Sequence, residues 1–372
     1  MAYVLLPMVC IQSLLINIMD VTSKGLFKGT AVHVIVTFTL LAVLVLSVIV
    51  AVTFGTVSIP FVDVYRVILQ GITGNRDEAY RRIHDIVWLI RLPRLILAIA
   101  VGASLSICGL AMQAIVKNPL ADPFILGVSS GAYAGVAMAI LLNVGLFFGV
   151  HSIGVMGFIG AFTASMTVVF LANVGGKANP VKLILAGTAV GAVSSAFSNF
   201  LIYFNTEAHR LQELVSWTMG SLGRATWSLN AVVMSVMLTG FIFFWSQHRR
   251  LNLMLLGDEA AITLGADLHK WRILYLLVSS LMVGFAVFSS GMIGFVGLVI
   301  PHAVRMMFGV DHKKLIPLCA LVGAIFLIWA DVLARILITG AELPIGILTS
   351  MIGAPCFIYL MARKKYGFGG SG

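Results

Sequence analysis

Residues 91–131 read RLPRLILAIAVGASLSICGLAMQAIVKNPLADPFILGVSSG, and this stretch decides the kind of fold. The run between Arg94 and Lys117 carries no charged side chain. It is long enough to cross a hydrocarbon core of about 30 Å as one helix. The turns Asn118-Pro119 and Asp122-Pro123 interrupt the chain before a second apolar run begins. The stretch therefore predicts a membrane-spanning helix that ends in a polar hairpin at the membrane surface.

The composition of the whole chain agrees with this prediction. Its 372 residues are 60% hydrophobic and 10% charged, and their mean hydropathy is +1.05. A soluble domain carries about 25% charged residues, so we predict an all-α, polytopic membrane protein. The net charge of +10 does not indicate nucleic-acid binding, because the charges lie in short segments between apolar runs. The cysteines lie in apolar runs without Cys-x-x-Cys spacing, which predicts buried hydrophobes and no metal site: Cys10, Cys108, Cys319 and Cys356.

The apolar segments predict about ten transmembrane helices, in contact with membrane lipid. We expect them near residues 31–55, 92–115, 124–148, 152–173, 183–204, 229–247, 272–289, 294–309, 315–338 and 345–362. Lys and Arg residues concentrate in alternate loops, which predicts that both chain ends are cytoplasmic. The first outer loop, residues 56–90, is the exception because it also contains several arginines.

The chain ends flank this transmembrane domain, which we place at residues 31–365. Residues 1–30 lack the basic start and the clear small-residue cleavage site of a signal peptide. We predict a cytoplasmic or interfacial N-terminal extension there, with an extra membrane span as the alternative. Residues 366–372 are expected to form a C-terminal tail.

Glycine spacing predicts where helices pack closely. Small residues four positions apart share a helix face and allow backbones to approach. Spacing by three near residue 294 predicts a helix that is broken or tightly crossed. The glycines concerned are Gly127, Gly131, Gly135, Gly187 and Gly191 at the first spacing, and Gly291, Gly294 and Gly297 at the second.

The motifs RLPR, NPLADP and LGVSSG of residues 91–131, in this order, resemble the FecCD-like permease subunits of type II ABC importers for iron-siderophore, heme and cobalamin. The resemblance covers about residues 31–365 and continues downstream in LILAGTAVG (183–191), WTMGSLG (217–223), LGDEAAITLG (256–265), GMIGFVGLVIPHAVR (291–305) and ELPIGILTSMIGAPCFIYL (342–360). The family usually begins near what is here residue 31. The resemblance implies two inverted halves, here about 92–204 and 272–362, and a homodimer or a pair with a related permease.

Energy for such an importer must come from another chain. The nearest sequence to a phosphate loop, Gly175-Gly176-Lys177-Ala178, lacks the upstream glycine and the hydroxyl residue after lysine. We therefore expect no cofactor and no enzymatic activity in this chain, with ATP and Mg bound by a partner ATPase subunit.

The longest inner loop, residues 248–271, is the candidate docking element for that subunit. It predicts two short helical pieces, Leu251–Leu256 and Glu259–Leu264, separated by Gly257 and ended by Gly265. An amphipathic loop on the lipid surface is the alternative. The resemblance implies that this loop couples to the ATPase through Leu256, Gly257, Asp258, Glu259, Ala260, Leu264 and Gly265.

Three arginines lie at the expected outer ends of the helices: Arg91, Arg94 and Arg335. Cations at helix ends commonly anchor a helix by snorkelling to the interface. The resemblance implies instead that these arginines pair with acidic residues on the two lobes of an extracytoplasmic substrate-binding protein. Such surface pairs are weak individually and contribute mainly to register and association rate. Asp331 lies four residues before Arg335, which predicts an ion pair along one helix face, with a proton relay as the alternative.

Two proline turns are candidates for cytoplasmic gates. Asn118-Pro119-Leu120-Ala121 and Asn179-Pro180-Val181 both place irregular backbone at the inner mouth, where it is tolerated if it lines a cavity. The resemblance implies gate roles for Asn118, Leu120, Pro180 and Val181, although the family often has small hydroxyl residues at the second gate. His302 is expected to be structural and not a metal ligand.

The function that these patterns favour is the permease subunit of a binding-protein-dependent importer in a bacterial inner membrane. Its cargo would be a metal chelate, a ferric siderophore first, with heme or cobalamin as alternatives. The alternative function is a stand-alone secondary transporter for an organic metal complex. Only one clear carboxylate lies within a predicted span, which leaves little for proton coupling, although backbone carbonyls can build sodium sites.

Overall fold

The computed structural model describes residues 30–363 except 56, 58, 75–77, 175, 177 and 339. Within these ranges the chain is helical, and one isolated bridge joins Ile338 and Ala341. The predicted extension, apart from Thr30, and the predicted tail lie outside the described residues. The longer helices are α2 (Thr30–Ala51), α3 (Phe61–Thr73), α5 (Leu92–Val116), α6 (Val128–Leu142), α7 (Ser152–Asn173), α8 (Pro180–Tyr203), α9 (Ala208–Thr218), α10 (Trp227–Ser246), α11 (His248–Leu256), α12 (Asp258–Thr263), α13 (His269–Ser290), α14 (Val296–Phe308), α15 (His312–Ile336) and α16 (Ile345–Arg363).

Each predicted apolar segment corresponds to a helix. Among the described residues, seven helices are long and apolar enough to cross a membrane; they contain α2, α5, α7, α8, α10, α13 and α15. Three shorter apolar helices, α6, α14 and most of α16, account for the remaining predicted spans. The prediction of about ten membrane helices is therefore confirmed, with three of them shorter than the roughly 20 residues typical of a full span.

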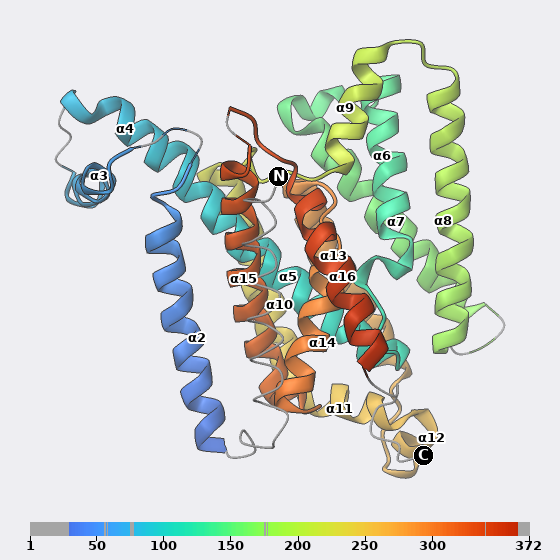
Figure 1. Ribbon diagram of the computed structural model, residues 1–372. Coiled ribbons are helices and arrows are strands. Elements are labelled where there is room, and N and C mark those ends of the chain that lie inside the picture. Colours follow the sequence, from blue (N-terminus) through green and yellow to red (C-terminus); the bar gives the residue numbers. More distant parts are fainter. Residues whose placement is uncertain are drawn as a thin grey trace.

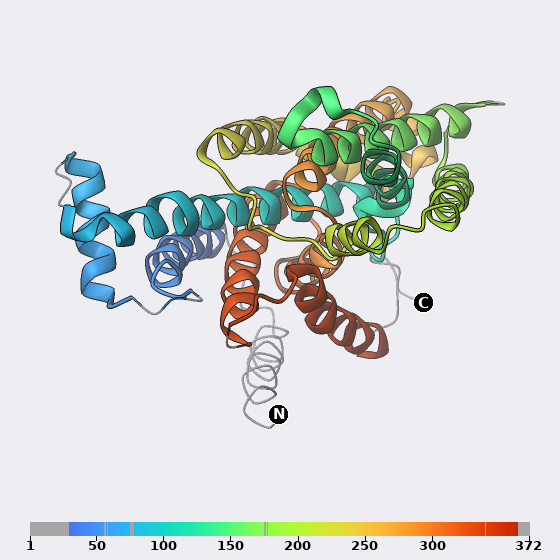
Figure 2. The ribbon, with the colours of Figure 1, turned by 90° about the horizontal axis from the view of Figure 1, so that it is seen from above.

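Helix α5 is the centre of the molecule. It packs against α15, α10, α14 and α13, and nearly all of its side chains are buried. Seen from above, it runs through the middle of the bundle, with α2 and α3 toward one end and α8 toward the other (Figure 2). We call the end with α3 and α9 the outer end and the end with α11 and α12 the inner end, following the predicted orientation (Figure 1).

Two glycines of α5 lie directly against the backbones of neighbouring helices. A Cβ atom on Gly102 would lie 2.3 Å from the carbonyl oxygen of Gly323 in α15. A Cβ atom on Gly109 would lie 1.8 Å from the carbonyl oxygen of Gly297 in α14. Because real Cβ contacts are never so short, only glycine permits these crossings.

The glycine spacings have mixed outcomes. Gly131 and Gly135 approach the backbone of α7 closely, as predicted. Gly127 belongs instead to the left-handed turn that precedes α6. The predicted break near residue 294 is confirmed, because α13 ends at Ser290 and α14 begins only at Val296.

The first outer loop is more ordered than its polar composition indicated. After α3, the short helices η1 (Glu78–Tyr80), α4 (Arg81–Asp85) and the π-helical turn η2 (Ile86–Arg91) lead directly into α5. The start of α5 at Leu92 agrees with the predicted residue 92, and these short helical elements extend it toward the outer side. Pro93 explains the π turn, since proline cannot donate a backbone hydrogen bond and its ring clashes with the carbonyl group four residues earlier.

Candidate functional site

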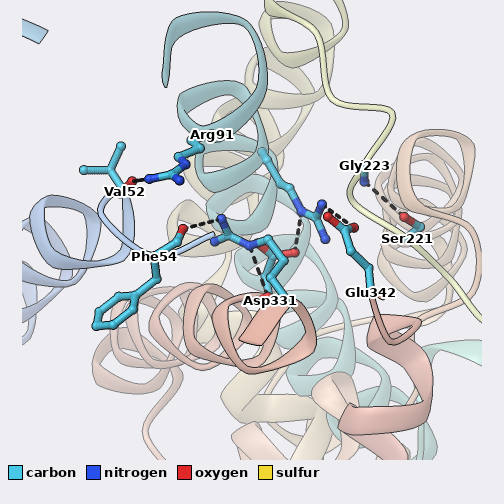
Figure 3. Close-up of polar contacts among 9 residues, drawn as sticks. Val52, Phe54, Arg91, Ser221, Gly223, Asp331 and Glu342 are labelled. Atoms are coloured by element: carbon cyan, nitrogen blue, oxygen red, sulfur yellow. Dashed lines mark hydrogen bonds and ion pairs between the residues drawn. The ribbon is translucent and has the colours of Figure 1, made fainter. Parts of the chain in front are cut away.

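Four charged side chains from three segments meet at the outer end of α5 (Figure 3). Arg94 places Nε 2.7 Å from Oδ1 of Asp331 and Nη1 2.7 Å from Oε2 of Glu342. Arg335 places Nε 3.1 Å from Oδ2 of Asp331. The predicted ion pair between Asp331 and Arg335 is thus confirmed, and the same carboxylate also holds Arg94. We call Arg94, Asp331, Arg335 and Glu342 the outer charge cluster.

Arginines of this region also bind the backbone where α2 ends. Arg91 donates from Nη1 to the carbonyl oxygens of Val52 and Thr53, both at 2.9 Å. Arg335 donates from Nη1 to the carbonyl oxygen of Phe54 at 2.8 Å. These bonds tie the start of α5 and the end of α15 to the turn after α2. They supply hydrogen bonds that buried guanidinium groups require.

The three predicted docking arginines are enclosed by groups of this chain. Arg91, Arg94 and Arg335 are only 3%, 4% and 4% exposed, and each binds groups of this chain. They do not snorkel to the interface in this arrangement, and their pairing with a binding protein stays a prediction. Glu342 is the exposed member of the cluster, with 42% of its side-chain surface accessible. At this outer end the arginines are buried beneath the surface, and Glu342 is exposed on it.

The first predicted gate is a hydrogen-bonded turn directly after α5. The helix ends at Lys117, which has a left-handed conformation with φ of 54°. The side chain of Asn118 accepts a hydrogen bond from the backbone N–H of Leu120 at 2.9 Å. Asn118 and Leu120 are both half-buried. The irregular backbone predicted at this point is therefore present, and a hydrogen bond to the Asn118 side chain stabilises the turn.

The second predicted gate differs from expectation. Pro180 and Val181 form the first turn of α8, so the irregular backbone stops at Asn179. The Asn179 side chain accepts a hydrogen bond from the N–H of Lys182 at 2.8 Å. Asparagine before a helix and proline at its first position favour the start of a helix. For this reason α8 begins at Pro180, where we predicted irregular backbone. Val181 is 64% exposed.

The predicted coupling segment has the expected form. Helices α11 and α12 are separated by Gly257, and Gly265 follows the second of them in a left-handed conformation. Both helices project at the inner end (Figure 1). Three large apolar side chains of this segment are more than 60% exposed: Leu256, Ile262 and Leu264. Ile262 was not among the predicted residues. Exposed apolar groups gathered on a projecting element are typical of a protein-binding surface.

A partly buried polar cluster attaches α11 to the start of α15. Asn252 donates to Oδ1 of Asp311 at 2.9 Å and accepts from the N–H of His312 at 2.9 Å. Asp311 also caps α15 by accepting from the N–H of Lys313 at 3.1 Å. Burial raises the pKa of Asp311, but the hydrogen bonds and the nearby Lys314 outweigh this and hold it below its ordinary value.

Replacing Asp311 with Ala is expected to lower the free energy of unfolding by about 1–2 kcal/mol, as for loss of a helix N-cap. Asp311→Asn is the matched control, because asparagine caps helices as well as aspartate does. Thermal unfolding in detergent measures both. If Asn were as damaging as Ala, the charge and not the cap would be what Asp311 contributes.

Sequence reasoning predicted the form of the coupling segment and the turn at Asn118 but missed two contacts between distant segments. Glu342 bonds Arg94, and Arg272, described below, bonds Ala178. No local spacing indicates such contacts. No group of three or more His, Cys, Asp or Glu side chains that could hold a metal ion occurs within the described ranges.

Comparisons with known proteins place this geometry in context. The sequence model of the FecCD transport family matches residues 5–363, and so begins within the segment we set apart as an extension. The hemin transport system permease protein HmuU of Yersinia pestis is 43% identical over 75% of this chain and 84% of its own length. The vitamin B12 import system permease protein BtuC of Salmonella arizonae is 42% identical over 75% of this chain and 83% of its own.

Two further similarities cover more of the chain. The uncharacterized ABC transporter permease protein YvrB of Bacillus subtilis is 39% identical over 90% of this chain and 94% of its own. A solved structure of a metal-chelate type ABC transporter in an inward-facing conformation superposes with a TM-score of 0.75 at 30% identity. That superposition covers 88% of this chain and 99% of the other.

Proposed function

This chain belongs to the FecCD transport family and is an ABC importer permease, and on that premise we propose which cargo it carries and how it is driven. The resemblance drawn from the sequence motifs is thereby confirmed. The proposed cargo is a bulky metal chelate of the ferric siderophore, hemin or cobalamin class. The names of relatives support this class, since they include a hemin permease, a vitamin B12 permease and a metal-chelate transporter.

The proposed source of energy is a separate ATPase subunit that docks on α11 and α12. The observation that carries this proposal is the projecting helix pair with Leu256, Ile262 and Leu264 exposed at its surface. The sequence itself has no phosphate loop, so ATP and Mg would be bound by the partner. A second copy of this chain or a related permease would complete the assembly in a bacterial inner membrane, with both chain ends cytoplasmic.

We also propose that a substrate-binding protein docks at the outer face. Glu342 and Gly223 both lie close to Arg94 Nη1: Glu342 bonds it at 2.7 Å, and a Cβ atom on Gly223 would lie 3.8 Å from it. Direct pairing of Arg94 with a partner's carboxylate would therefore require displacement of Glu342. Cytoplasmic gating by Asn118, Leu120, Pro180 and Val181 remains part of the same proposal.

Uptake into proteoliposomes tests this function. The vesicles contain this chain and its ATPase, and the binding protein is added on the outer face with hemin, cyanocobalamin or a ferric hydroxamate chelate. We expect uptake of one of these compounds that requires ATP and both partners. Uptake by this chain alone, driven by an ion gradient, would contradict the importer proposal and favour the secondary transporter.

A further inference from the structure

Arg272 joins the coupling segment to the second gate. It lies in the first turn of α13 and is 2% exposed. Its Nη1 donates to the carbonyl oxygen of Ala178 at 2.8 Å, and its Nη2 donates to Oδ1 of Asp258 at 2.5 Å. Ala178 directly precedes Asn179, the N-cap of α8, and Asp258 is the first residue of α12. One guanidinium group thus connects three segments that are separate in the sequence.

The residue before Asp258 lies against the first gate. A Cβ atom on Gly257 would be 2.8 Å from Nζ of Lys117, the residue that precedes Asn118. Gly257 has φ of 104°, which side chains other than glycine rarely adopt. Two consecutive residues of the coupling segment therefore reach the flanks of both predicted gates, one by close packing and one through Arg272.

The chemistry of the guanidinium makes this link stiff. Its planar fork donates in two fixed directions at once, whereas the ammonium group of lysine is a compact charge that cannot reproduce that geometry. Asp258 is 40% exposed, so its bond to Arg272 is weaker than that of a fully buried ion pair. The two segments are linked because one planar group, itself 2% exposed, binds both acceptors in fixed directions, so displacement of α12 favours displacement of the Ala178 carbonyl group. A rigid element that contacts two sites is the physical basis on which they are coupled.

We infer that Arg272 is a positioning residue that transmits displacement of α12 to the start of α8 and so to the second gate. The inference rests on the proposed function, because a partner ATPase must supply the displacement. It goes beyond that function by assigning the transmission to one side chain. The inference predicts that ATP binding and hydrolysis by the partner do not depend on Arg272.

A thiol reporter on the gate tests the inference without knowledge of the cargo. The reporter is Val181→Cys, since Val181 is exposed. Cys10 and Cys356 are replaced with Ala, while Cys108 and Cys319 are buried and can remain. The complex of this chain with its ATPase is reconstituted, and the rate of alkylation by N-ethylmaleimide is measured with and without Mg-ATP. ATP hydrolysis and co-purification of the ATPase are measured on the same samples.

In the parental reporter protein, Mg-ATP is expected to change the alkylation rate. Arg272→Lys is expected to reduce that change by about tenfold, a typical coupling effect. Hydrolysis and co-purification should stay near the parental values. Lys270→Gln is the matched control, because Lys270 is an exposed cation in the same helix turn. It should behave as the parental protein does.

Each other outcome has a distinct meaning. If Arg272→Lys keeps the full ATP-dependent change, Arg272 does not transmit it and the inference is overturned. If the Arg272 variants lose the ATPase on purification, Arg272 maintains the docking surface instead, which also overturns the inference. If the parental protein binds no ATPase and shows no ATP-dependent change, the proposed function fails, whatever the variants do.

Discussion

Replacing Asp331 with Ala is expected to destabilise the protein by about 3–5 kcal/mol, the usual cost of leaving a buried ion pair with one partner missing. Asp331 is fully buried and bonds both Arg94 and Arg335. Its loss leaves two enclosed guanidinium groups that face each other without the anion between them. Unfolding in detergent titrated with dodecyl sulfate measures the change in free energy.

Glu342→Ala is the matched control for this prediction. Glu342 also bonds Arg94 at 2.7 Å, but its side chain is 42% exposed. Water can therefore replace it, and the expected cost is below about 1 kcal/mol, as for a surface ion pair. If the two variants lowered the free energy of unfolding equally, burial would not be what makes Asp331 more important to stability than Glu342.

A compensating variant separates charge from packing. Replacing Arg94, Asp331 and Arg335 together with Met, Leu and Met removes the three buried charges of the cluster and leaves the exposed Glu342. Well-packed apolar replacements of buried ion pairs are commonly neutral or stabilising. The triple variant should therefore be more stable than Asp331→Ala alone. If it were less stable, the bond from Arg335 to the carbonyl group of Phe54 would matter more than charge balance.

The part of the site that the sequence predicted is the part with local signals. Asp331 and Arg335 are four residues apart, so a helix alone brings them together. The form of the coupling segment followed from Gly257 and Gly265, which interrupt and end its helices. Asn179-Pro180 carried a helix-start signal that we interpreted as irregular backbone, and the local rule for asparagine and proline would have given the observed boundary.

The contacts that the sequence could not predict join distant segments. Arg94 and Asp331 are 237 positions apart, and Arg272 reaches Ala178 across 94 positions. Such pairs depend on the packing of α5, α8, α13 and α15, which periodicity does not specify. The burial of the three arginines was missed for the same reason, because a cation at a helix end is usually exposed. Long-range packing thus encloses three arginines that local spacing would place at the surface.

Replacing Gly109 with Leu is expected to prevent α5 and α14 from packing and to remove most of the folded protein. Even the Cβ atom would lie 1.8 Å from a backbone oxygen of α14. A backbone atom cannot move aside as a flexible side chain can, so the two helices must separate. Overpacking costs about 1–3 kcal/mol in an adaptable core and more in a rigid one. Gly109→Ala should give a milder form of the same loss, because alanine adds only the Cβ atom and not the rest of the leucine side chain.

The matched control is Gly191→Ala in α8, where the added Cβ atom would meet only Ser130 Oγ at 3.5 Å, an ordinary contact. It should be neutral or slightly stabilising, because alanine favours a helix interior. The monodisperse fraction in detergent and the unfolding temperature measure both variants. Gly102 and Gly109 are seven residues apart, so they share a face of α5. That face meets α15 at one glycine and α14 at the other. A stable Gly109→Leu protein would mean that the central helix does not need this crossing, and then the positions of Arg94 and Lys117 at its two ends would have to be maintained by other contacts.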